Sequence, residues 1–246
     1  MRKSEKLSVI YILKFIAFVL LFVIIGNGIG LLWRYIGEAS EKSAQNVSAV
    51  RDRATVVIDA GHGGRDGGAV ALSKISEKDL NLDVSLALAE MLRGSGVNVV
   101  LTRDGDYMLS CDEGSTNKGR DLAARRRIIQ SQENAIFVSI HMNSFPQAEY
   151  KGLQVYYSEN NELSKRLAET VQSYTVENLQ KNNKRQTKMG RDIYLLETAE
   201  CPAILVECGF LTNPEEAELL NNAEYRRKLA LILCAAVCDF LGEASD

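Results

Sequence analysis

The chain has 246 residues, of which 46% are hydrophobic and 25% are charged, and it contains three prolines. That length and composition are typical of a globular protein with one well-buried core. The net charge of −3 excludes the strongly basic surface on which general nucleic-acid binding depends.

The segment over residues 15–33 carries no charged side chain. A helix needs about 20 residues to cross the hydrocarbon core of a membrane, so this segment is long enough. Lysines and an arginine within residues 1–14 precede it, and such cations favour a cytoplasmic N-terminus. We therefore predict a single-pass membrane anchor, a polar tether over residues 34–53, and an extracytoplasmic globular domain over residues 54–246.

A cleaved signal peptide is the alternative interpretation of the same segment. Gly37 and Ala39 are small residues of the kind found at cleavage sites. The apolar region of a signal peptide usually spans about 7 to 15 residues, which is shorter than this one, so the anchor is favoured. In both interpretations the protein works beyond the cytoplasmic membrane, either attached to it or secreted.

Five short apolar runs indicate β-strands, over residues 55–60, 97–102, 135–141, 152–157 and 203–210. Runs without polar interruption fit strands that are buried on both faces of a mainly parallel sheet. Between them, helices are expected over residues 76–94, 120–132, 161–181, 214–220 and 223–241, with Ser76 and Asn213 as N-caps. The alternation predicts one α/β domain of three layers.

The five cysteines are an odd number and show neither a disulfide framework nor a CxxC spacing. We expect all of them to have structural roles, and the sequence leaves their oxidation state open. They are Cys111, Cys201, Cys208, Cys234 and Cys238.

The first predicted strand leads into a glycine-rich loop, "IDAGHGGRDGGAV", over residues 58–70. A dinucleotide-binding turn is excluded, because the third glycine of that fingerprint would fall at Asp66 and no Walker lysine follows. The loop is therefore either a plain turn with an incidental histidine or a site at which His62 acts as a ligand.

The only other histidine, His141, also stands at the end of a predicted buried strand. Active sites of α/β proteins form at the carboxyl ends of strands, so His62 and His141 are expected to share one site. Catalytic zinc commonly takes two histidines and a carboxylate. Glu77, in the first turn of the next helix, is the candidate third ligand; favourable interaction with the helix dipole is the alternative explanation for it.

A carboxylate also lies inside the apolar run "AILVECGF", at Glu207. Burying a carboxylate without a partner is costly, so its presence needs a reason. Glu207 is a candidate proton acceptor beside a metal, and a structural ion pair with an arginine is the alternative.

Five ordered blocks resemble the zinc-dependent N-acetylmuramoyl-L-alanine amidases of the Amidase_3 type: "VVIDAGHGGRDGGA", "SEKDLNL", "LTRDGD", "FVSIHMNS" and "CPAILVECGFLTNPEE". The resemblance covers about residues 54–241 and implies a three-layer α/β/α sandwich with a mixed sheet. It places His62, Glu77 and His141 on the family's zinc ligands and Glu207 on its catalytic glutamate.

Two arginines and one loop complete the comparison with the family pattern. Arg103 and Arg125 match arginines that recur in such enzymes, and Arg125 is expected to pair with a buried carboxylate. The loop over residues 106–120 gives little family pattern to align, and the pattern assigns no substrate-binding residue.

The resemblance implies zinc-dependent hydrolysis of the amide bond between the lactyl group of N-acetylmuramic acid and L-alanine of the stem peptide in peptidoglycan. A lone catalytic domain behind a membrane segment is similar to the sporulation amidases of Firmicutes that help to form muramic-δ-lactam in the spore cortex. The expected partners are peptidoglycan and the membrane, and the sequence leaves open whether an accessory protein is needed. The alternatives are a zinc peptidase that cuts within the stem peptide and a non-catalytic wall-binding domain. The basic segment over residues 181–191 either contacts acidic wall polymers or is a solvated loop.

Overall fold

The computed structural model describes residues 28–37, 54–71 and 74–243. The chain divides into two units, Met1–Ser48 and Ala49–Asp246. In the first unit residues 28–37 are helical, and among the described residues no helix combines the length and the apolar character that a membrane span requires. Residues 1–14, most of the predicted anchor at 15–33 and most of the tether at 34–53 lie outside the described residues.

The second unit is built on one six-stranded mixed sheet with the strand order β2-β1-β3-β6-β4-β5. Four neighbouring strands, β2, β1, β3 and β6, run parallel, whereas β4 runs antiparallel to β6 and β5 runs parallel to β4. The strands are β1 (Thr55–Ala60), β2 (Asn98–Leu101), β3 (Ala135–Asn143), β4 (Gln154–Tyr157), β5 (Lys188–Met189) and β6 (Ala203–Phe210).

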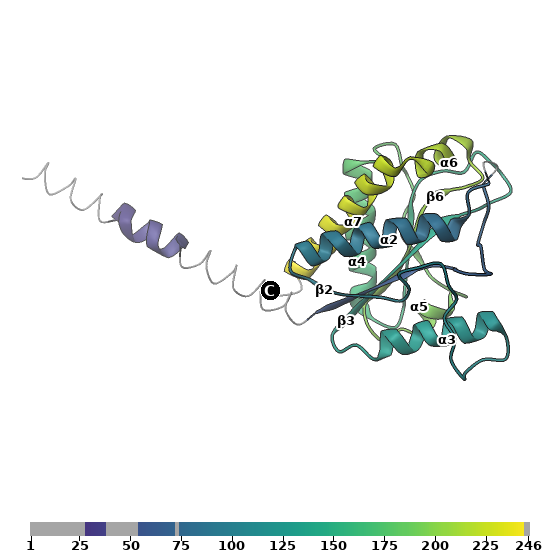
Figure 1. Ribbon diagram of the computed structural model, residues 1–246. Coiled ribbons are helices and arrows are strands. Elements are labelled where there is room, and N and C mark those ends of the chain that lie inside the picture. The colour runs from purple at the N-terminus through teal and green to yellow at the C-terminus, as the bar shows by residue number, and fades with distance from the viewer. Residues whose placement is uncertain (1–27, 38–53, 72–73, 244–246) are drawn as a thin grey trace, which may run out of the picture. The chain divides into compact units, whose positions relative to one another are not determined.

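Helices cover both faces of this sheet (Figure 1). One face packs against α2 (Glu77–Gly94), α4 (Glu162–Asn178) and α7 (Ala223–Glu243), and the other against α3 (Asn117–Gln130) and α5 (Tyr194–Thr198). The remaining helix, α6 (Pro214–Asn221), contacts α7 and β6. This arrangement confirms the predicted three-layer α/β/α domain and its mixed sheet.

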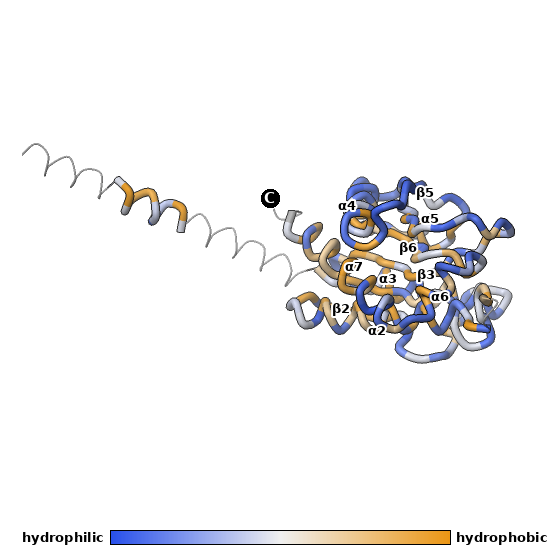
Figure 2. Tube along the Cα trace, turned by 90° about the horizontal axis from the view of Figure 1, so that it is seen from above, coloured by the Kyte–Doolittle hydropathy of each residue, from blue (hydrophilic) through white to orange (hydrophobic). Residues whose placement is uncertain are grey.

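The alternation of side chains along β1 explains why the strands are apolar without interruption. Val56 and Ile58 belong to the core under α2 and α7, whereas Val57 belongs to a second core with Phe137 and Leu196, under α3 and α5. Each strand residue therefore meets a helix layer on its own side. Figure 2 shows the same distribution, with hydrophobic segments at β3, β6 and α7 and hydrophilic segments toward the outer loops.

The expected bounds of β1 and β6 are confirmed, and the other predicted strands differ by one to two residues at an end. The helix expected at 120–132 begins earlier, at Asn117, because the Thr116 side chain accepts a hydrogen bond from Gly119 N at 3.0 Å and caps it. The short elements β5 and α5 were not expected. They are too brief to show a hydrophobic period.

The two predicted N-caps have different outcomes. Asn213 caps α6, because its Oδ1 accepts a hydrogen bond from Glu216 N at 3.1 Å. Ser76 occupies the N-cap position of α2, but its side chain does not accept a bond from the helix; its hydroxyl donates to Asp79 Oδ2 at 2.6 Å. The prediction of the position was correct and that of the capping bond was wrong.

Candidate active site

The residues singled out by the sequence gather where the parallel strands β1, β3 and β6 end. His62 follows the last residue of β1 by two positions, and His141 and Glu207 are register partners on β3 and β6. Parallel strands present their carboxyl ends at one edge of a sheet, and the glycine-rich loop crosses that edge. Glu77 reaches it from the first residue of α2.

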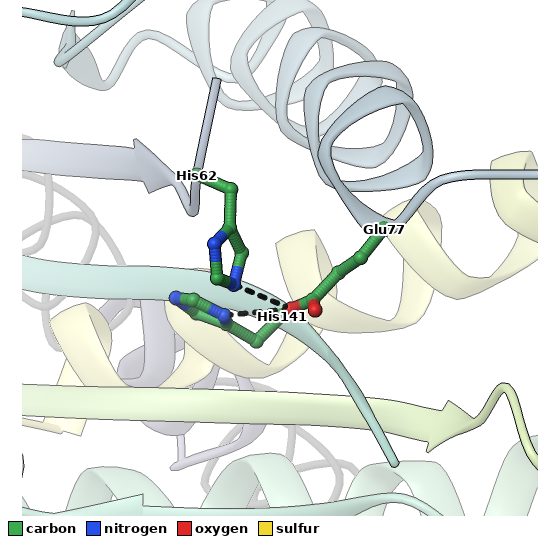
Figure 3. A group of neighbouring side chains, drawn as sticks. All are labelled: His62, Glu77 and His141. Carbon is green, nitrogen blue, oxygen red and sulfur yellow. Dashed lines mark hydrogen bonds and ion pairs between the residues drawn. The ribbon is translucent and has the colours of Figure 1, made fainter. Parts of the chain in front are cut away.

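His62, Glu77 and His141 point toward one another (Figure 3). Glu77 Oε1 lies 2.8 Å from His141 Nδ1 and 3.2 Å from His62 Nε2. Each residue offers one ligand atom, and these atoms all lie within 4.8 Å of one another. Two imidazole nitrogens and one carboxylate oxygen are the donor set that catalytic zinc commonly takes, so the three residues fit this metal.

Glu77 is buried and held by the backbone of two other segments. Its Oε2 accepts a hydrogen bond from Ala69 N at 2.8 Å, and its Oε1 accepts one from Met142 N at 3.2 Å. Burial alone would raise the pKa of Glu77, but His141 and His62 outweigh it and keep the pKa well below its usual value. Glu77 is therefore ionised and fixed in place, which a charge serving only the helix dipole would not require.

Asp66 is a site residue that the sequence reasoning missed. Its Oδ1 lies 2.9 Å from His62 Nδ1, the ring nitrogen that faces away from Glu77. Carboxylates commonly stand behind metal-binding histidines and fix their ring orientation. The residue that excluded a dinucleotide fingerprint is thus a positioning group for His62. The spacing of a histidine and an acid four residues apart in the loop was the available signal.

Glycines allow the loop to pass close to these side chains. A Cβ at Gly61 would lie 2.2 Å from His141 Nε2, and one at Gly68 would lie 2.5 Å from Glu77 Oε2. His62 itself adopts a left-handed backbone with φ of 62°, which is uncommon for a residue other than glycine. At both positions a residue without a Cβ is therefore needed for the backbone to pass this close to the site.

Two fully buried arginines bind the carbonyl groups of the same loop. Arg103 donates from Nε to Ala60 O at 2.8 Å and from Nη2 to Gly61 O at 2.9 Å. Arg125 donates from Nη1 to Ala60 O at 2.8 Å and from Nη2 to His62 O at 2.6 Å. The carbonyls of three consecutive residues are therefore saturated by charged donors, which sets the path of the chain into His62.

The charge of Arg125 is balanced by two buried carboxylates, as the sequence led us to expect. Its Nη1 lies 2.6 Å from Asp59 Oδ1 and its Nε lies 2.8 Å from Asp121 Oδ2. Burial opposes the ionisation of Asp59, but Arg125 and the hydroxyl of Ser139 outweigh it and lower the pKa of Asp59 below its usual value. The pair is thus ionised and satisfied inside the domain.

Glu207 differs from these carboxylates because no arginine forms an ion pair with it among the described residues. The residue is partly exposed, but its Oε2 is shielded from solvent and has no hydrogen-bond partner. Burial raises the pKa of Glu207 to about 7, Glu77 adds to the rise, and His141 opposes it. Among the described residues the alternative of a structural ion pair therefore has no arginine to form it, and Arg103 and Arg125 bind the glycine loop instead.

A cavity of about 260 Å³ opens beside the two histidines. His62 and His141 line one part of it, and Ile193, Tyr194 and Leu196 of the α5 region line another. The side chains of α5 therefore form a wall of the site, although the sequence contained no pattern that identified this helix.

Loop 106–120, for which no role was predicted, supports the glycine loop from outside. Asp106 accepts hydrogen bonds from Gly64 N and from Lys78 Nζ, both at 2.7 Å. The backbone oxygen of Tyr107 lies so close to Gly63 that a Cβ there would stand 2.5 Å from it. No disulfide bond joins the five cysteines, all of which lie in the described part of the chain, and Cys208 and Cys234 are buried.

Comparison with known proteins agrees with this geometry. Residues 56–239 match the family described as N-acetylmuramoyl-L-alanine amidase, Amidase_3. A germination-specific N-acetylmuramoyl-L-alanine amidase of Bacillus subtilis is 34% identical over 195 residues, which cover 78% of this chain and 81% of that protein. The CwlD amidase from Clostridioides difficile, solved in complex with the GerS lipoprotein, superposes with a TM-score of 0.72 and 38% identity over 76% of this chain and 98% of its own. The amidase AmiC2 of Nostoc punctiforme gives a TM-score of 0.68 and 33% identity over 77% and 97% of the two chains.

The chain therefore belongs to the N-acetylmuramoyl-L-alanine amidase family. It is a hydrolase that acts on cell-wall peptidoglycan, and a germination-specific amidase is among its similar relatives.

Replacing Gly61 by alanine tests whether the close approach of the loop positions His141. The new Cβ has to displace the His141 ring, and a shift of about 1 Å near the chemistry can cost roughly 10²-fold in rate. Gly67→Ala is the matched control in the same loop, because a Cβ there meets nothing within 4 Å. We expect Gly61→Ala to lose about two orders of magnitude in peptide release from peptidoglycan and Gly67→Ala to retain wild-type activity. Equal activity of the two variants would contradict the positioning role.

Proposed function

We propose that this amidase is zinc-dependent, with His62, Glu77 and His141 as the three protein ligands and Glu207 as the general base and acid. The observation that carries this proposal is the convergence of two imidazoles and an ionised carboxylate beside Glu207, whose shielded Oε2 has no hydrogen-bond partner among the described residues. The bond cleaved is the amide between the lactyl group of N-acetylmuramic acid and L-alanine of the stem peptide.

Each group has a separate chemical task in this proposal. Bound zinc supplies a Lewis acid that lowers the pKa of water toward neutrality and polarises a carbonyl group. Glu207 accepts the proton that the attacking water loses and then donates it to the departing L-alanine nitrogen, since an amide nitrogen cannot leave as an anion. Asp66 and the backbone amides of Ala69 and Met142 hold His62 and Glu77 in their orientations.

The two alternatives from the sequence have less support. A zinc peptidase that cuts within the stem peptide would use the same ligand types, but the matched family and the similar relatives are amidases of the lactyl bond. A non-catalytic wall-binding domain would have no use for a shielded Glu207 oxygen without a hydrogen-bond partner, which is costly to keep.

The variant Glu207→Gln separates metal binding from catalysis. Glutamine keeps the size of the side chain but cannot take up a proton, so turnover should fall by at least about 10²- to 10⁴-fold. Zinc content should equal that of the wild type, and the thermal midpoint should hold or rise, because a shielded charge has been removed. The measurements are metal analysis, thermal unfolding, and mass spectrometry of the products released from peptidoglycan.

His62→Ala is the companion variant, because loss of a ligand should lower both zinc content and turnover. A Glu207→Gln protein that stays active would remove Glu207 from the mechanism. Full zinc content in His62→Ala would remove His62 from the metal site. Free stem peptides with intact lactyl-muramic acid identify lactyl-amide cleavage, whereas shortened peptides still attached to the glycan would identify a peptidase.

We also propose that the enzyme acts in spore cortex maturation, in the step that leads to muramic-δ-lactam. Support comes from two similar proteins, a germination-specific amidase and the CwlD amidase. The latter was solved with the GerS lipoprotein, and we propose that this chain likewise works with an accessory protein, which co-purification from sporulating cells would test.

Cortex composition tests the proposed step. Spores of a strain that lacks this chain should contain cortex without muramic-δ-lactam, because removal of the stem peptide must come before the lactam can close. The wild-type chain should restore the lactam, and Glu207→Gln should not. Normal lactam content in the deletion strain would exclude this role while leaving the amidase activity untouched.

The location of the protein stays a proposal based on residues 15–33. We propose that they anchor the protein in the cytoplasmic membrane with the amidase domain on the extracytoplasmic side; secretion after signal cleavage is the alternative. A reporter fused after Trp33 should be exported and remain with the membrane fraction, because cations precede the apolar segment. A soluble exported product that begins near Ser40 would instead identify a cleaved signal.

A further inference from the structure

Arg185 lies in the basic segment 181–191, on the opposite side of Glu207 from the two histidines. Its Nε donates to Lys151 O at 2.7 Å, and its Nη1 donates to Gln154 Oε1 at 3.0 Å. The guanidinium also lies over the ring of Phe210, 4.5 Å from its centroid. These contacts hold the side chain in one orientation, so Arg185 is not a freely solvated loop residue.

The charge of Arg185 has no carboxylate partner among the described residues. Glu216 interacts electrostatically with Arg185, but it forms no ion pair with it. The Glu216 oxygens accept hydrogen bonds from Gly152 N at 2.9 Å and Phe210 N at 2.8 Å. The partners of Arg185 are neutral, and its Nη2 donates to none of the described residues. A guanidinium that is fixed on an aromatic ring and still has unused N–H groups is suited to bind an anion through two hydrogen bonds.

The sheet relates this guanidinium to the proposed proton shuttle through one residue, Gln154. Gln154, which accepts from Arg185, is the register partner of Glu207 across the antiparallel pair β4–β6. Residues directly opposite in such a pair have Cα atoms about 4.5–5.5 Å apart and side chains on the same face of the sheet. The side chain of Gln154, which also donates to Gln186 O at 2.8 Å, therefore holds Arg185 one strand beyond Glu207.

The direction of the substrate follows from the role of Glu207. Because Glu207 returns a proton to the L-alanine nitrogen, the peptide side of the scissile bond has to lie toward Glu207, and the acyl side toward the histidines. Beyond Glu207 in the sheet comes β4, and beside it a groove of about 590 Å³ lined by Arg185, Tyr150 and Gly152. If Glu207 is the proton shuttle, the stem peptide leaves the reacting centre toward β4 and this groove.

We propose that Arg185 is a specificity-determining residue that binds a free carboxylate of the stem peptide beyond L-alanine. The proposal rests on the proposed lactyl-amide cleavage and adds the chemistry of the peptide that is accepted. A peptide whose acidic residue keeps its carboxylate would pair with Arg185. A peptide in which that group is converted to a carboxamide would leave the guanidinium without an anion.

The experiment compares two peptidoglycan fragments that differ only in this group, carboxylate against carboxamide, at the residue after L-alanine. Wild-type enzyme should favour the carboxylate fragment by roughly tenfold or more in kcat/KM, the range expected for a hydrogen bond to a charged group. Arg185→Gln should lose this preference, mainly through a higher KM for the carboxylate fragment, because the contact lies away from the reacting atoms. Lys165→Gln, at an exposed residue of α4 outside the groove, is the charge-matched control and should keep the preference.

Several results would overturn the proposal. They are equal use of both fragments by the wild type, an unchanged preference in Arg185→Gln, and an equal slowing on both fragments, which would identify a purely structural role. If thermal unfolding shows that Arg185→Gln does not fold, the preference of the wild type and its change in Arg185→Lys decide instead. Failure of lactyl-amide cleavage itself would appear as no hydrolysis of either fragment by the wild type, and would overturn both proposals.

Discussion

The site depends on two buried guanidinium groups that bind the carbonyl oxygens of residues 60–62. The glycine loop has almost no side chains with which to pack, and buried carbonyls without partners would make it unstable. Arg103 and Arg125 supply charged donors from two other segments of the chain. Removing either guanidinium would leave several polar groups unsatisfied at once. The carbonyl groups of residues 60–62 are consequently hydrogen-bonded, although the loop that begins here is not part of a helix or a named strand.

This arrangement explains why a histidine can occupy a left-handed backbone position at the edge of the sheet. Arg125 binds the carbonyl of His62, Asp66 faces the outer nitrogen of its ring, and Glu77 faces the inner one. The cost of a positive φ, of order 1–3 kcal/mol, is offset by contacts made on every side of the residue. Asp59 balances the charge of Arg125, so the frame adds no uncompensated charge beneath the site.

The residues that the sequence predicted share one property: each can be recognised from the few residues on either side of it in the chain. His141 and Glu207 each interrupt or end an apolar run, and parallel strands bring such positions to one edge of the sheet. Asp66, which was missed, had a local signal as well, because it stands four residues after His62. The position of Arg185 depends instead on a pairing between distant segments, because its guanidinium lies over the ring of Phe210. The helix α5 is too short to show a period, yet it lines the cavity. No pattern along the chain contains such information.

The antiparallel direction of β4 gives the mixed sheet a functional consequence. In a fully parallel sheet the strand beside β6 would present its carboxyl end at the active edge. Here Gln154, the first residue of β4, lies opposite Glu207, so the connection that precedes β4 joins the site. That connection contributes Lys151, whose carbonyl binds Arg185, and Gly152, whose amide binds Glu216. Because β4 runs in the opposite direction, the two histidines lie on one side of Glu207 and the guanidinium of Arg185 lies on the other. A substrate whose acyl and peptide parts differ in charge would be oriented by this division alone.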